Sequence, residues 1–577
     1  MIRPVPGARR ATGRRGDTGS PEPSGSPARP SRGRPGGPRW WTVPLPAAWG
    51  AILLVGVSLT PSLLPRSGEV QGLVSGITAA CGHALGLGAA AVWRAFADRG
   101  PRSARGGAWR LFVVLAAVLL TVSFVLGRRW QAELRRLMGA PEEPLWHALL
   151  APVVAVVVYA VLVGTGRILH VAARGAGRLL SRWMGVRAAR TVGALVVGAA
   201  VVLVVTDVAV DGFVAAADRT FSLADDDTPD GVARPDSPLR SGGPGSAVPW
   251  EALGREGRVF VAGGPSAAQI GAVTGRPARP PVRVYAGLEL TDDVEQRARA
   301  VAAELDRTGG FQRARLLVAT TTGSGWVDGD WAAAFEYLSG GDSAIASMQY
   351  SYLPSALSYL VDQDRARAAG RELFDAVYER WTALPADDRP ELYVFGESLG
   401  SFGAEAAFSG EHDLHNRTSG AVFVGPPSFN TLFTEFRDDR DPGSPEVEPV
   451  YRDGRTVRFS TEPDGGAHPS PDGPWNGTRV LYVQHPSDPV VWWSPSLLFE
   501  RPDWLAEPPG DDVLDDMAWI PLVTFWQVTL DLPFATDVPS GHGHRYDREA
   551  VAAWAAVLRP PGWTRADTRR LEEVLER

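Results

Sequence analysis

The stretch Leu392-Tyr393-Val394-Phe395-Gly396-Glu397-Ser398-Leu399-Gly400 decides the fold class of the C-terminal half. Its first four residues are the apolar run of a buried strand, and the run 402–408 behind it suits a helix. Gly-x-Ser-x-Gly between the two predicts a sharp turn, because side chains two residues from Ser398 would collide there. Such a strand, turn and helix present a serine as a nucleophile. An inert Gly-Ser loop is the alternative, since this pattern also arises by accident in a glycine-rich chain.

Strand-like and helix-like segments alternate on both sides of this unit, from about residue 248 onward. Alternation of this kind is typical of parallel α/β sheets. The sequence therefore predicts an α/β fold with a doubly wound, mostly parallel sheet of about six to eight strands. The strand-like runs are 282–286, 314–320, 346–352, 392–395, 419–424 and 479–484, and the helix-like runs include 291–307, 362–383 and 548–558.

A serine hydroxyl becomes a nucleophile only when a base takes its proton and a carboxylate orients that base. Asp488 follows the run 479–484, at the strand end where doubly wound sheets gather site residues. Asp488 is therefore the predicted acid, with Asp531 and Asp537 as alternatives. Because a proline follows Asp488, an ordinary turn is the competing interpretation.

Two histidines, His542 and His544, follow Asp488, and both lie in one Gly-rich loop. Either could be the base; we favour His544, with His542 then contacting substrate or supporting the base. A metal held by this pair would lack a convincing set of further ligands, and Cys81 is the single cysteine. The sequence predicts neither a metal site nor a cofactor.

Acyl transfer also needs backbone N–H donors for the oxyanion. Leu399, directly after the nucleophile, is the predicted first donor. The Gly-rich turn after the run 314–320 offers Gly323 or Ser324 as the second, and a turn without that role is the alternative. Between acid and base lies an aromatic insertion, 491–538, which is either a cap over a lipid-like substrate or ordinary core.

The first two fifths of the chain have a membrane composition. Five apolar stretches occur at about 43–64, 71–93, 109–128, 146–166 and 189–210, and about 20 apolar residues are needed to cross a bilayer. Pro, Gly and Ser interrupt the first two, so buried soluble helices are the alternative there. The predicted domains are a disordered basic tail at 1–41, a transmembrane domain at 42–214, a linker at 215–247 and a catalytic domain at 248–577.

Arginine clusters predict the orientation, because positive charge is retained on the cytoplasmic side. The clusters in the tail and after the second and fourth stretches share one side if five helices cross from an inner N-terminus. The catalytic half would then lie outside the cytoplasm, anchored in the plasma membrane, although arginines at 128–129 and 135–136 oppose this. The C-terminal half concentrates acidic residues, which leaves no basic field for nucleic acid.

Five strings occur in order along the chain: Pro61-Ser62-Leu63-Leu64-Pro65-Arg66, the Gly-Glu-Ser-Leu-Gly turn, 485–493, Thr524-Phe525-Trp526-Gln527 and Gly541-His542-Gly543-His544. Together they resemble the actinobacterial membrane α/β-hydrolase family of unassigned function. The resemblance implies a multi-helix membrane domain fused to an α/β-hydrolase domain. Ser398, Asp488 and a histidine of the 541–544 loop match the triad pattern of that family.

The main hypothesis is a membrane-anchored serine hydrolase acting on carboxylic esters, either small or lipid-like, beside the lipid bilayer. An acyltransferase would use the same triad with an alcohol in place of water. A non-catalytic membrane scaffold is the third hypothesis, although Ser, Asp and His in the correct order argue against it. The sequence identifies neither the acyl group nor the oligomeric state.

Overall fold

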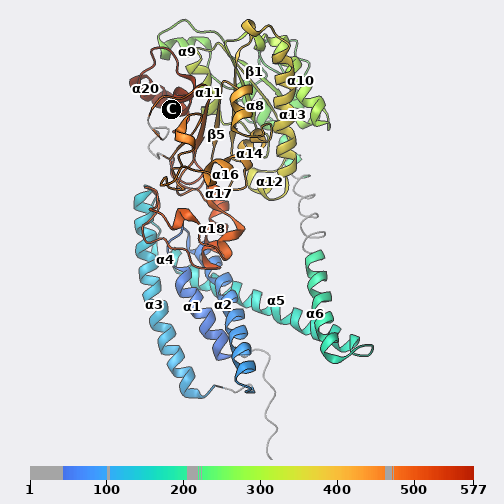
Figure 1. The fold of residues 1–577 in the computed structure, drawn as a ribbon, viewed down its shortest axis with the longest axis vertical. Coiled ribbons are helices and arrows are strands. Elements are labelled where there is room, and N and C mark those ends of the chain that lie inside the picture. Colours follow the sequence, from blue (N-terminus) through green and yellow to red (C-terminus); the bar gives the residue numbers. More distant parts are fainter. Residues whose placement is uncertain are drawn as a thin grey trace, which may run out of the picture. The chain divides into compact units, whose positions relative to one another are not determined.

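The computed structural model describes residues 43–100, 104–204, 219, 221–222, 224–461, 471 and 473–576. The C-terminal part of these residues forms one seven-stranded sheet, and every strand pairing in it is parallel (Figure 1). The predicted α/β class is confirmed. In spatial order the strands are β1 (Val282–Ala286), β3 (Ser343–Met348), β2 (Arg315–Thr320), β4 (Glu391–Glu397), β5 (Gly420–Val424), β7 (Arg479–Val483) and β6 (Val457–Ser460).

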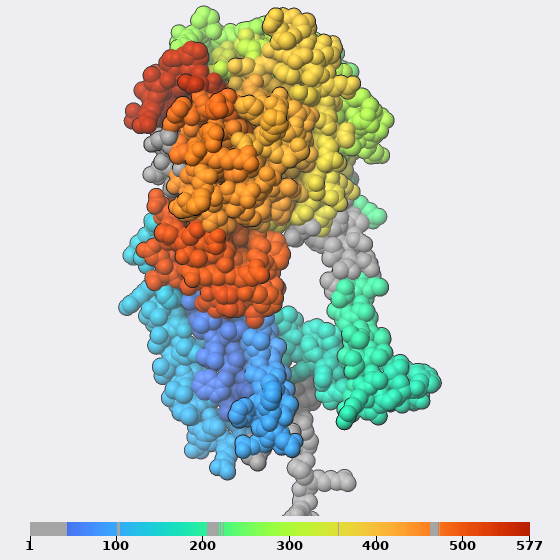
Figure 2. Space-filling model, in the orientation of Figure 1, coloured from blue at the N-terminus to red at the C-terminus, as the bar shows by residue number. Residues whose placement is uncertain are grey.

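Helices cover both faces of the sheet, as a doubly wound fold requires. On one face α10 (Val294–Thr308) and α13 (Gln363–Thr382) pack together over β1, β2 and β3, and α13 also packs on α14 (Leu399–Glu405). The yellow segment that includes α13 lies at the surface in the space-filling view (Figure 2). On the other face α11 (Gly329–Leu338) packs against α19 (Ala550–Leu558), which contacts β5 and β7.

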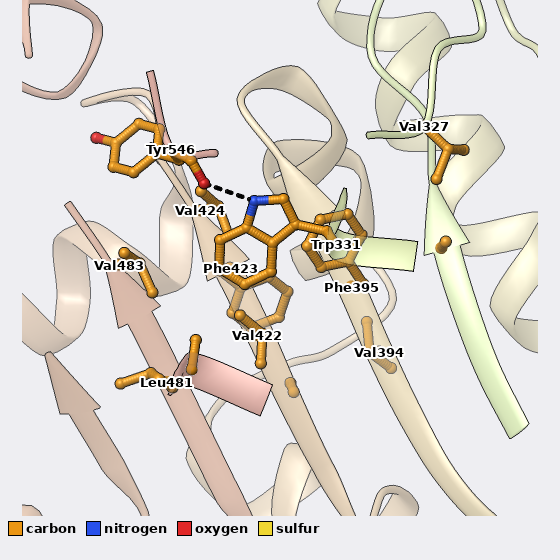
Figure 3. Close-up of a cluster of buried hydrophobic side chains, with 14 of the residues drawn as sticks. Val327, Trp331, Val394, Phe395, Val422, Phe423, Val424, Leu481, Val483 and Tyr546 are labelled. Carbon is orange, nitrogen blue, oxygen red and sulfur yellow. Dashed lines mark hydrogen bonds between the residues drawn. The ribbon is translucent and has the colours of Figure 1, made fainter. Parts of the chain in front are cut away.

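Trp331 of α11 organises the core on this second face. Its ring stacks on Phe395 of β4, with the ring centroids 5.4 Å apart, and its indole N–H donates to the carbonyl of Tyr546 at 2.9 Å (Figure 3). A buried indole needs such an acceptor. The contact fixes the chain just after His544 against the sheet.

The N-terminal part of the described residues is helical. Four of its helices are long and apolar enough to cross a membrane: α2 (Gly68–Phe96), α3 (Gly106–Leu137), the continuous stretch of α4 (Leu145–Ala148) and α5 (Leu150–Leu180), and α6 (Val186–Leu203). The first predicted crossing, 43–64, corresponds to α1 (Leu45–Ser58), which has 14 residues. The end of the fifth predicted crossing, 205–210, lies outside the described residues, so five crossings stay a prediction.

Helices α1 and α2 approach each other backbone to backbone. A Cβ atom on Gly82 would lie 2.1 Å from the carbonyl oxygen of Gly50, and one on Gly50 would lie 2.0 Å from that of Gly82. Small residues permit such close packing of apolar helices. The glycines that weaken the apolar pattern of these two stretches are therefore the reason that the helices fit together.

The described part of the expected linker packs against the sheet domain. The Asp225 carboxylate accepts a hydrogen bond from the backbone N–H of Arg255 at 2.9 Å, and the buried Ser241 hydroxyl donates to Glu304 at 3.1 Å. A Pro-, Gly- and Ser-rich composition predicts an exposed segment, but it carries no information about hydrogen-bond partners in distant parts of the chain. The domain boundaries at 215 and 248 stay a prediction.

Candidate active site

Ser398 lies on the turn between β4 and α14 and is 8% exposed. Its backbone has φ 52° and ψ −125°, a conformation that costs energy for any residue except glycine. A Cβ atom on Gly396 would lie 2.3 Å from the carbonyl oxygen of Gly400, and one on Gly400 would lie 2.4 Å from that of Thr320. The serine N–H donates to the Val424 carbonyl at 2.8 Å, which ties the turn to β5. The Gly-x-Ser-x-Gly pattern thus has the steric cause that the sequence indicates.

Asp488 lies in the loop beyond β7 and begins the short helix α17 (Pro489–Trp492). Its side chain is fully buried, and one oxygen accepts the N–H of Val490 at 2.8 Å. The other oxygen is 2.7 Å from Nδ1 of His544 and accepts the hydroxyl hydrogen of Tyr546, also at 2.7 Å. A carboxylate on Nδ1 keeps the proton there and leaves Nε2 to accept another.

The other histidine of the loop has a different partner. Nδ1 of His542 lies 3.2 Å from the carboxylate of buried Asp512, which also accepts the hydroxyl of Ser487. Ser487 in turn accepts the backbone N–H of Gly543 at 2.8 Å. His542 therefore contributes to the links that hold the loop, whereas His544 reaches Asp488.

The two alternative acids lie away from this arrangement. Asp531 accepts the Nε hydrogen of Arg66 at 2.8 Å and also binds the hydroxyl of Ser62. Asp537 is exposed. Of the three carboxylates considered from the sequence, Asp488 is the one that contacts a histidine.

Ser398 and His544 line one pocket of about 310 Å³. The remaining residues around it come from the loop after β2, the start of α12 (Ser355–Val361), the end of β4 and the chain beyond residue 535. A larger cavity, of about 670 Å³, is lined by residues that include Arg440 and Asp503, and by neither Ser398 nor His544. The residues that line the smaller pocket are Thr322, Trp326, Asp328, Ser355, Glu397, Ser398, Thr536, His544, Arg545, Tyr546 and Asp547.

The loop after β2 contributes Thr322 to the pocket and not the two neighbours expected from the sequence. Gly323 packs against the segment before α12, where a Cβ atom would lie 2.4 Å from the Leu353 carbonyl oxygen. Ser324 presents its carbonyl to the amide of Gln349 at 3.2 Å. The Thr322 hydroxyl is buried and has no hydrogen-bond partner in the described part of the chain. Leu399, the other expected donor, is fully buried at the start of α14.

Sequence reasoning missed two residues that hold His544. Gly425, directly after β5, has φ 50°, and a Cβ atom there would lie 2.6 Å from Cε1 of His544 and 2.7 Å from Cε2 of Tyr546. Tyr546 is bound to Asp488 and also stacks on His485, with the ring centroids 4.1 Å apart. Gly425 itself was the available signal, because a glycine at a strand end beside a site often marks a place where another group packs closely against the backbone.

Carboxyl groups dominate the charge around the pocket. Burial raises the pKa of Asp328 to about 6 and raises the pKa of Glu397 well above its usual range. The guanidinium of Arg545 is bound to Asp547 at 2.9 Å. Among the described residues, no group of three His, Cys, Asp or Glu side chains is arranged to hold a metal ion.

The aromatic insertion packs on itself, on the N-terminal helices and on the sheet domain. Its helix α18 (Val523–Asp531) contacts α1 and α2, and the rings of Trp492 and Trp504 lie 5.5 Å apart in the core. Phe499 is 74% exposed. Of the described residues of the insertion, Thr536 lines the pocket.

Similarity to known proteins covers both parts of the chain. A model described as "Alpha/beta-hydrolase family" matches residues 282–571, which include the sheet, Ser398, Asp488 and His544. A second model, described as "Alpha/beta-hydrolase family N-terminus", matches residues 59–265. No curated protein and no solved structure matches the chain. The chain therefore belongs to the alpha/beta-hydrolase family, with the N-terminal region of that family preceding the sheet domain.

Proposed function

We propose that this protein is a membrane-anchored serine hydrolase that cleaves carboxylic esters through an acyl-enzyme. Ser398 is the nucleophile, His544 the base and Asp488 the carboxylate that orients it. The observation that carries the proposal is the position of His544. Its Nδ1 binds buried Asp488 at 2.7 Å, and its ring lines the same pocket as the strained Ser398.

In the first half-reaction the Ser398 oxygen bonds to the ester carbonyl carbon while its proton passes to Nε2 of His544. The tetrahedral intermediate collapses when the carbon–alkoxide bond breaks and His544 returns the proton to the departing alcohol. In the second half-reaction water gives a proton to His544 and bonds to the acyl carbon; the bond from that carbon to the Ser398 oxygen then breaks, His544 returns the proton to Ser398, and the carboxylic acid leaves. Asp488 stabilises the imidazolium in both steps without taking a proton.

The negative oxygen of each intermediate needs hydrogen-bond donors. The backbone N–H of Leu399 is the first proposed donor. For the second we favour the hydroxyl of Thr322 over the backbone of Gly323 or Ser324, because Thr322 lines the pocket and its hydroxyl has no partner among the described residues.

The four long apolar helices support an anchor that crosses the membrane several times. The arginine distribution favours an anchor in the plasma membrane with the catalytic domain on the outer side, away from the cytoplasm. Contacts of α18 with α1 and α2 bring the insertion next to this anchor. A lipid-like or otherwise acyl-bearing ester of the envelope is therefore the favoured substrate.

Labelling with a fluorophosphonate probe, in membranes that contain the full chain, tests the proposal. We expect labelling of the parent, none of Ser398→Ala, weak labelling of His544→Ala and retained labelling of His542→Ala. A folded parent that never reacts would reject the activated serine and favour the scaffold hypothesis. Product analysis with an added alcohol distinguishes hydrolysis from acyl transfer.

A further inference from the structure

Glu397 brings an unpaired buried oxygen to the pocket that holds Ser398. The residue is 8% exposed, lines the pocket, and its Oε2 has no hydrogen-bond partner among the described residues. Buried polar atoms are nearly always hydrogen-bonded, so an exception needs an explanation. Beside a nucleophile, that explanation is a substrate group that completes the hydrogen bond.

The charges around the pocket limit what this group can be. Asp328 and Asp547 line the same pocket as Glu397, and the guanidinium of Arg545 is already bound to Asp547. A phosphate or carboxylate on the substrate would therefore face the carboxyl groups of Asp328 and Asp547 in a partly desolvated site. Repulsion between like charges is strong in such surroundings.

The protonation of Glu397 favours a neutral partner. Burial, together with the charges of Asp328 and Asp547, raises the pKa of Glu397 well above its usual range. A raised pKa favours the uncharged carboxyl group, which has one oxygen that donates a hydrogen bond and one that accepts. A hydroxyl group also donates and accepts, so the two are complementary.

We propose that Glu397 selects ester substrates whose alcohol part carries a free hydroxyl group, as in esters of glycerol or of sugars. This inference rests on the proposed hydrolase function and assigns a class to its substrate. Glu397 and Ser398 line the same pocket, so a hydroxyl bound by the carboxyl group shares that pocket with the reacting ester. Asp328 and Asp547, which line the same pocket, disfavour esters with an anionic alcohol part.

Matched esters test the proposal on the purified full-length protein. Four butyrate esters differ in the alcohol part: glyceryl (hydroxyl groups), methyl (no donor), choline (cation) and glycolate (anion). We expect the parent to have the highest kcat/KM on the glyceryl ester and to hydrolyse the glycolate ester about tenfold less well or worse. A preference for the choline or the glycolate ester would overturn the proposal, and this comparison needs no variant.

Two substitutions at Glu397 then assign the preference to this side chain. Glu397→Leu should lower the glyceryl-to-methyl ratio of kcat/KM about tenfold, whereas Glu397→Gln, which still donates and accepts, should keep most of it. Glu405→Gln is the matched control, because Glu405 is also buried but is bound by Asn430 and Tyr482 away from the pocket. An unchanged ratio in Glu397→Leu, in protein that still reacts with fluorophosphonate, overturns the inference alone. A parent that hydrolyses none of the four esters overturns the hydrolase proposal and this inference with it.

Discussion

Two buried carboxylates of the C-terminal part, Asp488 and Asp531, each bind one basic side chain, and the two pairs differ in what that side chain can do. His544, bound to Asp488, also lines the pocket of Ser398. Arg66, bound to Asp531, comes from the loop between α1 and α2, and both members of this pair are at most 1% exposed. The first pair opens onto a pocket, and the second joins two parts of the chain.

The comparison shows why burial and charge alone do not identify a site. Histidine gains and loses a proton near neutral pH, whereas arginine keeps its proton at any pH that proteins meet. Asp488 therefore holds a group that can exchange protons with a substrate, and Asp531 holds a permanent cation. Both aspartates fit the sequence order expected for a catalytic acid, so the partner decides between them.

The largest expected effect distinguishes the two histidines of the loop. His544→Ala should lower kcat for ester hydrolysis about 10⁴-fold or more, because it removes the base. His542→Ala is the matched control and should cost far less, since its partner is Asp512. Steady-state hydrolysis of one ester by both variants gives the comparison. Equal losses would contradict the assignment of His544 as the base.

The second effect concerns the Arg66–Asp531 pair. Asp531→Ala should destabilise the protein by about 3 to 5 kcal/mol, because it leaves a buried cation without its partner. Replacing both members, as in Arg66→Met with Asp531→Leu, should recover most of that loss. Thermal unfolding in detergent measures both variants. If the single and double variants unfold at the same temperature, the pair does not stabilise the junction in this way.

A smaller effect is expected at Tyr546, which shares Asp488 with His544. Tyr546→Phe removes one hydrogen bond to the carboxylate and leaves the aromatic ring in place, so kcat should fall about tenfold with little change in KM. Tyr337→Phe, in α11 and outside the pocket lining, is a suitable control. An unchanged kcat would mean that the histidine alone is sufficient to hold Asp488.

The smallest effect depends on pH. Burial by itself lowers the pKa of His485, but the hydrogen bond and charge of Glu549 outweigh it and raise the pKa to about 9. The folded state then binds a proton more tightly than the unfolded state, so this stabilisation is complete below about pH 6.5 and is lost as the pH rises toward 9. Thermal unfolding across this range should show a steeper decline for the parent than for His485→Gln. Parallel curves would contradict the protonated state of His485.

The alternation of apolar segments was sufficient to predict the α/β class, but it missed β6. This strand is four residues long and lies at the edge of the sheet, and Arg458 interrupts its apolar character. The strand predicted at 346–352 is β3, which begins earlier, at Ser343. The sequence misplaced its start because Ser343 and Ser347 are polar and yet buried. Short edge strands and buried polar residues carry little periodic signal.

Candidate site residues could be placed from the sequence where their position follows from a strand end, and elsewhere depended on a choice; their catalytic roles stay predictions. Ser398 and Asp488 each follow a buried strand, and the structure brings both to the carboxyl ends of the parallel strands. His542 and His544 lie in one Gly-rich loop, so the sequence does not distinguish them. In the structure they differ in their partners: His542 contacts Asp512 and His544 contacts Asp488. Thr322 lies beside the expected Gly323, but the direction of its side chain depends on a turn that the sequence does not define.

The loop between α1 and α2 also limits how the protein can be divided. Leu64 of this loop is buried and packs against Gly543, the residue before His544. A Cβ atom on Gly543 would lie 3.3 Å from Cδ2 of Leu64. A fragment that began at residue 248 would lose both Leu64 and Arg66, which exposes apolar surface beside the histidine loop and leaves Asp531 without its cation. The N-terminal region thus completes the core beside the histidine loop. An unrelated N-terminal segment in its place would leave the same two gaps, at Leu64 and at Arg66.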